Sequence, residues 1–114
     1  MVHYPYQEMI ACPERREEEK RAMEGFDGTF ARRHQQALAT LAEKIELEYF
    51  GMDCAENANG DLVIFEVASA MLVHAMDNPE VFPYKAVQMH KVFSAFQAML
   101  ADSVPTGPEV AAHA

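Results

Sequence analysis

The chain has 114 residues, half of them hydrophobic, and this composition is typical of a single globular domain rather than a disordered segment. Its formal net charge of −9 argues against nucleic acid and anionic membranes as partners, because both need a basic surface. The sequence has no apolar run near the ~20 residues of a membrane span and no signal-peptide pattern, so we expect a cytoplasmic protein.

The first 45 residues predict an edge strand and two helices. Residues 2–6 can form a strand, but Pro5 lacks an amide donor and restricts it to a sheet edge. Residues 13–24, PERREEEKRAME, place Pro13 at a first helical position and mix charges at i,i+4 spacing, which is typical of a solvated helix. Residues 29–45 predict an amphipathic helix that Asp27 or Thr29 caps. Its apolar side comprises Phe30, His34, Ala37, Leu38, Leu41 and Ile45.

A β-hairpin is predicted over residues 47–55 and 62–68. The intervening Asn59-Gly60 is a strong hairpin signal, because a type I′ turn needs positive φ at both central residues. A turn centred there places Asp53 directly opposite Glu66. Side chains alternate along a strand, so two faces follow. The helix-facing side then carries Phe50, Met52, Cys54, Val63, Phe65 and Val67, and the other carries Tyr49, Gly51, Asp53, Leu62, Ile64, Glu66 and Ala68.

Asp53 and Glu66 are the candidate site residues. Like charges directly opposite on a sheet are destabilising, at the level of about 0.2–1 kcal/mol for a cross-strand pair. Solvent, a proton shared between the two carboxyl groups, or a bound cation such as Mg²⁺ could offset this repulsion. The residues alone leave these three alternatives open.

The last part of the chain predicts a loop-rich segment and a long helix. Residues 71–85, MLVHAMDNPEVFPYK, contain two prolines, and Phe82 and Tyr84 anchor the turn into a helix over 84–102. Residues 104–114 predict a flexible tail, so residues 1–103 form one domain. The expected fold is α+β, with a short antiparallel sheet packed on one side by the 29–45 and 84–102 helices.

Other reactive side chains favour structural roles. Cys12 and Cys54 are far apart without a CxxC pair, and we expect free thiols. His74 with Asp77, near Glu66, could complete a transition-metal site, but the chain lacks HxxxH and HExxH spacing, which favours a structural hydrogen bond. Cys54 falls on the helix-facing side, so a core position is favoured over a nucleophile. We assign no catalytic residue.

Two stretches, LEYFGMDCAENANGDLVIFEVASAMLVHAMD and FPYKAVQMHKVFSAFQAML, resemble the C-terminal part of an ATP-grasp domain. The resemblance implies that the hairpin Asp and a Glu-x-Asn on the second strand hold the Mg²⁺ ions that bridge the nucleotide phosphates. Asp53 and Glu66 match the first two ligands, whereas Ala68 stands in place of the Asn. Gly51 occupies a position where many members of this family carry a basic residue.

The N-terminal lobe that grips the nucleotide in that family has no counterpart in this chain. We therefore expect a non-catalytic, truncated ATP-grasp-like domain that either self-associates or docks on another protein. A homodimer is expected because the sheet face with Tyr49, Leu62 and Ile64, together with a strand edge, would otherwise face water.

The alternative is the Mg²⁺ and ATP half-site of an ATP-dependent carboxylate–amine ligase. The resemblance implies that such an enzyme forms an acyl-phosphate, which an amine then attacks. Activity would require a partner protein that supplies the missing lobe, because phosphoryl transfer depends on positioning and charge neutralisation. The chain could also be a fragment of a longer protein, or a sensor that binds a nucleotide or a metal weakly.

Overall fold

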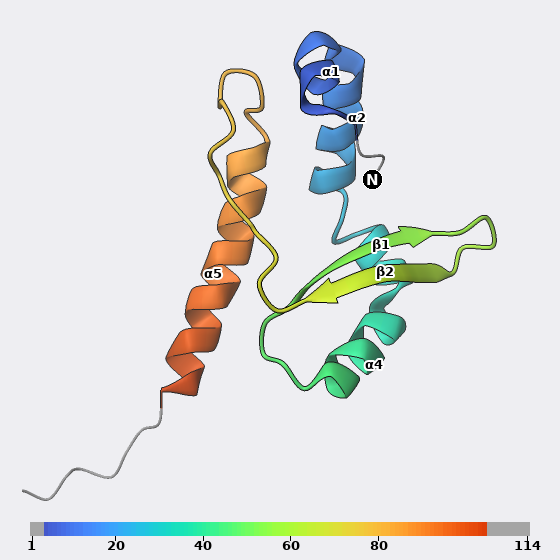
Figure 1. The fold of residues 1–114 in the computed structure, drawn as a ribbon, viewed down its shortest axis with the longest axis vertical. Coiled ribbons are helices and arrows are strands. Elements are labelled where there is room, and N and C mark those ends of the chain that lie inside the picture. The colour runs from blue at the N-terminus through green and yellow to red at the C-terminus, as the bar shows by residue number, and fades with distance from the viewer. Residues whose placement is uncertain (1–3, 105–114) are drawn as a thin grey trace, which may run out of the picture.

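The computed structural model describes residues 4–104, which form an α+β fold of helices around one β-hairpin (Figure 1). This confirms the predicted fold class. The elements in chain order are α1 Tyr6–Ala11, α2 Pro13–Glu24, α3 Phe30–Arg33, α4 Gln35–Ile45, β1 Gly51–Glu56, β2 Leu62–Ala68 and α5 Lys85–Ser103. The edge strand predicted for residues 2–6 is wrong where it can be checked, because Tyr6 already begins α1. The predicted tail from 105 onward lies outside the described residues.

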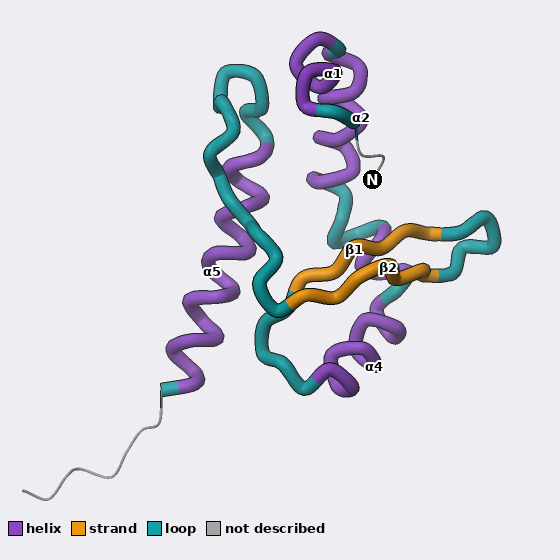
Figure 2. The backbone as a smooth tube through the Cα atoms, in the orientation of Figure 1, coloured by secondary structure: helices purple, strands orange, loops and turns teal. Residues whose placement is uncertain are grey.

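α1 and α2 lie at one end of the molecule and α4 at the other, while α5 runs along its length (Figure 1). α2 packs on α5 at one end, while α4 runs beneath the hairpin at the other (Figure 1). The segment between β2 and α5 is a loop that runs back along α5 before entering it (Figure 2). Because this loop carries the chain to the α1–α2 end, α5 begins there. Further along α5, Phe96 contacts Tyr49, which precedes β1, edge to face with 5.2 Å between the ring centroids. Within the described chain, no helix is long and apolar enough to span a membrane.

The helix predicted over residues 29–45 is divided at His34. Its φ of −104° and ψ of 13° lie outside helical geometry, and they separate α3 from α4. Thr29 precedes α3 but does not cap it, because its hydroxyl donates to the Gly25 carbonyl at 2.7 Å. The apolar period of the sequence persists through this break, so the pattern alone could not show it.

The hairpin turn differs from the predicted type I′ turn. Gly60 has a φ of 86°, but Asn59 is not among the positive-φ residues of the described chain. The Gly60 amide donates to the Asn57 carbonyl at 3.0 Å, and the Asn57 side-chain oxygen accepts from the amides of Asn59 and Asp61 at 2.9 Å. These bonds form a three-residue loop that ends on a left-handed glycine, which is a common alternative to the two-residue turn.

A β-bulge changes which side chains share a face. Asp53 pairs with Glu66 as predicted, but the next pair is Cys54 with Ile64, so Phe65 is an extra residue in β2. A one-residue shift moves side chains to the opposite face. Leu62 and Ile64 consequently border a hollow shared with α4, although the predicted register placed them away from the helices. Phe65, predicted to face the helices, is 70% exposed.

The fully buried core is small and lies where α1 and α2 meet the segment before α5. Its buried apolar residues, among those described, are Met9, Phe82 and Tyr84. The Tyr84 hydroxyl donates to the Glu19 carboxylate at 2.7 Å, which joins this segment to α2. Burial, followed by the hydrogen bond to Glu19, raises the pKa of Tyr84. The anchoring role predicted for Phe82 and Tyr84 is confirmed.

Candidate functional site

Asp53 and Glu66 lie directly opposite each other on the hairpin, as the sequence predicts. Both side chains are exposed. The two residues form the last regular pair of the ladder on the side of the bulge away from the turn. Neither forms an ion pair in the part of the chain that is described. Over residues 4–104, no cluster of three or more His, Cys, Asp or Glu side chains could hold a metal ion. The structure thus brings two carboxylates together without a third such ligand.

Gly51 lies on the same face as Asp53, and its missing side chain has a structural reason. A Cβ atom at this position would lie 2.6 Å from Cβ and 2.8 Å from the sulfur of Met71. The loop after β2 therefore packs directly against the Gly51 backbone. A basic residue, which the ATP-grasp resemblance implies here, would require that loop to move.

The other histidine and cysteine candidates have structural roles. His74 Nδ1 accepts a hydrogen bond from the Met76 amide at 3.2 Å, and Asp77 accepts one from Lys85 at 3.1 Å. This arrangement does not form the transition-metal site that we considered with Glu66. Cys12 and Cys54 are free thiols, as predicted. Burial, with a smaller contribution from Asp53, raises the pKa of Cys54, which disfavours the nucleophilic thiolate.

A charged network that the sequence analysis missed joins the hairpin to α3. Glu56 Oε2 lies 2.7 Å from Nε2 of His34 and 3.1 Å from both Nε and Nη2 of Arg33. His34 is 6% exposed, and its ring packs on Phe30 with centroids 4.7 Å apart. The sequence shows His34 on an apolar stripe, which indicates packing but not its partner. The hydrogen bond from His34, followed by that from Arg33, lowers the pKa of Glu56 below its usual 4.5.

This network predicts an acid-dependent loss of stability. Because the folded-state pKa of Glu56 is lower than the unfolded value, its stabilising contribution is present above about pH 4.5 and disappears as pH falls through the folded-state pKa. The melting temperature of the wild type should therefore fall more steeply between about pH 5 and 3 than that of Glu56→Gln. Glu43→Gln, an exposed change on α4, is the control and should follow the wild-type curve. Parallel curves for wild type and Glu56→Gln would contradict this role.

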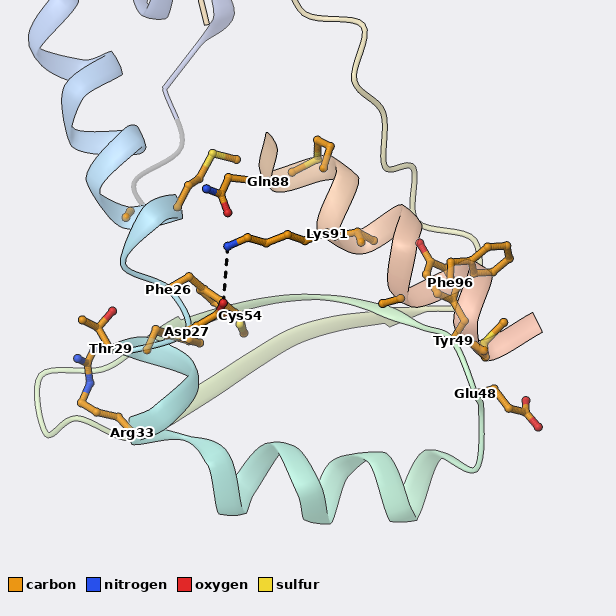
Figure 3. A pocket seen from close by; sticks show the side chains of 17 residues that line it. Phe26, Asp27, Thr29, Arg33, Glu48, Tyr49, Cys54, Gln88, Lys91 and Phe96 are labelled. Carbon is orange, nitrogen blue, oxygen red and sulfur yellow. Dashed lines mark ion pairs between the residues drawn. The ribbon is translucent and has the colours of Figure 1, made fainter. Parts of the chain in front are cut away.

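A large apolar groove lies between α2, α3 and α5 (Figure 3). Its volume is about 820 Å³, and it is lined by four aromatic rings and three methionines: Phe26, Phe30, Tyr49, Phe96, Met23, Met89 and Met99. Lys91 reaches across it toward Asp27, with 3.7 Å between the ammonium and the carboxylate (Figure 3). The sequence predicts that the apolar side of the helix over 84–102 packs on the sheet. The structure instead shows it lining an open groove.

Comparisons with protein-family models, with curated proteins and with solved structures give no match for this chain. The resemblance to ATP-grasp domains therefore stays a prediction that depends on the residues quoted for it.

Proposed function

We propose that the chain is a non-catalytic interaction domain, ATP-grasp-like in its hairpin, that forms a homodimer through the outer edge of β2. The observation that carries this proposal is the exposure of large apolar side chains along β2, a strand with one edge unpaired in the described sheet. These side chains are Val63 at 37%, Ile64 at 38%, Phe65 at 70% and Val67 at 40% exposure. They lie on a strand whose only partner within the described sheet is β1.

An unpaired strand edge favours pairing with another strand. A two-stranded sheet is marginally stable in water, and its unsatisfied amide and carbonyl groups are a template for a further strand. Antiparallel pairing of β2 with β2 of a second copy would create a four-stranded sheet with two-fold symmetry. Each Å² of apolar surface buried in this way contributes about 25 cal/mol. Contact between the sheet faces is disfavoured, because it would bring Asp53 and Glu66 of both copies together.

The bulge in β2 fits this interface. Natural strand edges are often protected by bulges or by charged side chains. Here the extra residue is Phe65, the most exposed of the large apolar side chains of the strand, so the bulge presents an aromatic ring instead of a charge. Aromatic anchors of this kind commonly supply most of the binding energy at protein interfaces.

The oligomeric state tests the proposal. Size-exclusion chromatography with light scattering should give twice the chain mass of 12.8 kDa at tens of micromolar protein. Phe65→Lys should yield a monomer with an unchanged circular dichroism spectrum, because a charge cannot be buried there without a partner. Leu72→Lys is the matched control, since Leu72 is 77% exposed but lies outside the strand, and it should remain dimeric. A monomeric wild type, or equal dissociation by both variants, would overturn the proposal.

The pairing of Asp53 with Glu66 favours a second candidate, the Mg²⁺ and ATP half-site of a carboxylate–amine ligase. The residues present supply two carboxylates, but Ala68 provides no third ligand, so they do not fit a complete metal site and any activity would depend on a partner lobe. Isothermal titration with ATP and Mg²⁺ should then give heat that Asp53→Asn and Glu66→Gln abolish and Asp61→Asn retains. Absence of heat with the wild type would exclude autonomous binding.

A further inference from the structure

We propose that the groove between α2, α3 and α5 binds a lipophilic organic cation, meaning a positively charged ligand with an aromatic or aliphatic body. At about 820 Å³, the groove falls within the size range of small-molecule sites. Such sites are mostly apolar with a few polar groups, and this is the composition of the lining described above. The proposal does not depend on the dimer.

The walls suit a cation with an apolar body. The rings of Phe26 and Phe30 stack with 5.6 Å between their centroids, and those of Tyr49 and Phe96 meet edge to face with centroids 5.2 Å apart. Aromatic surfaces therefore line two sides of the groove. Aromatic faces attract cations, because the ring quadrupole places negative charge above and below the ring plane. Methionines adapt their shape to irregular ligands and so favour a bulky body.

The charged residues around the groove favour a ligand with a positive charge. The Arg33 guanidinium is neutralised by Glu56, which leaves Asp27, Glu48 and Lys91 as the other charged lining residues. Glu48 points away from the groove in Figure 3, but its charge still contributes to the local field. Two negative charges therefore stand against one positive charge at this surface. The net charge of −9 adds a long-range field of the same sign.

The ion pair over the groove leaves Asp27 available to a ligand. The Asp27 and Lys91 side chains are 80% and 56% exposed, and their separation of 3.7 Å is longer than that of a charge-assisted hydrogen bond. Exposed pairs of this kind contribute little to stability. A ligand cation can therefore displace the Lys91 ammonium from Asp27 and at the same time rest against the rings.

Two ions of the same shape and opposite charge provide the direct test. Isothermal titration should show that tetraphenylphosphonium binds with 1:1 stoichiometry and about tenfold more tightly than tetraphenylborate. The full chain and the Phe65→Lys variant should give the same affinity, so failure of the dimer would not affect this result. Equal affinity for the two ions, or no binding of the phosphonium, would overturn the proposal.

Matched variants locate the site. Asp27→Asn should weaken phosphonium binding about threefold, whereas Asp102→Asn, which makes the same charge change on α5 outside the groove, should leave it unchanged. Ala95→Trp should abolish binding by filling the groove, and Ala98→Trp, on the same helix but not in the lining, should retain it. If Asp102→Asn weakened binding as much as Asp27→Asn, the attraction would be non-specific and the proposal wrong. If Ala95→Trp changed the oligomeric state, the groove would be an interface between copies, which also contradicts it.

Discussion

Replacing Phe82 with alanine is expected to lower the free energy of unfolding by about 3–5 kcal/mol. Phe82 is 1% exposed and is the largest fully buried side chain of the described chain. Its ring lies near those of Tyr6 and Tyr84, with centroids at 5.9 and 6.4 Å, and under the Lys85 ammonium at 4.2 Å. Because so few side chains are buried, the cavity would remove much of the core that joins α1, α2 and α5.

Thermal and urea unfolding followed by circular dichroism would measure this loss. Phe96→Ala is the control, because Phe96 is 39% exposed. This substitution removes the same number of atoms from a less buried position. It should cost about three-fifths as much, in proportion to the apolar surface it buries. Equal losses for the two variants would show that the segment before α5 is not the stabilising core.

Replacing Lys85 with methionine is expected to lower the free energy of unfolding by about 1–3 kcal/mol. The Lys85 ammonium lies 3.4 Å from Glu19 and 3.1 Å from Asp77, and all three side chains are at least three-quarters buried. Removal of the shared cation would leave two carboxylates facing each other in a partly desolvated site. The figure is smaller than for a fully buried pair, because some solvent still screens these charges.

The double variant Lys85→Met with Asp77→Asn should recover part of this loss, because it removes one of the two repelling charges. Lys91→Met is the matched control: its ion pair is exposed, so the change should cost little. Chemical denaturation of the four proteins would measure these differences. A loss for Lys91→Met as large as that for Lys85→Met would mean that burial does not determine the strength of these pairs.

Features that depend on neighbouring residues in sequence were predicted well. Pro13 begins α2 and the helix ends at Glu24, as the charge pattern and the proline indicate. Residues 62–68 form β2 as predicted, while β1 begins four residues later than expected, at Gly51. Local propensity and side-chain period are sufficient for these features.

Features that depend on tertiary contacts were not predicted. The loop set by Asn57 shifts the strand register by one residue relative to the predicted turn, and the extra residue Phe65 shifts it back before Asp53. The predicted pair of Asp53 with Glu66 is therefore correct, although the predicted turn is wrong. The break at His34 accompanies its hydrogen bond to Glu56, a residue 22 positions away. The apolar groove was not foreseen, because an amphipathic stripe on a helix does not reveal whether another element covers it.

The bond between Glu19 and Tyr84 joins residues 65 positions apart. A ribosome would therefore release α1 and α2 long before the segment that completes their packing has been synthesised. Until then Met9 and its neighbours would remain open to solvent and to chaperones, because the segment with Phe82 and Tyr84 that covers them has not yet been made. The first helices to be made would thus be among the last parts of the molecule to become ordered.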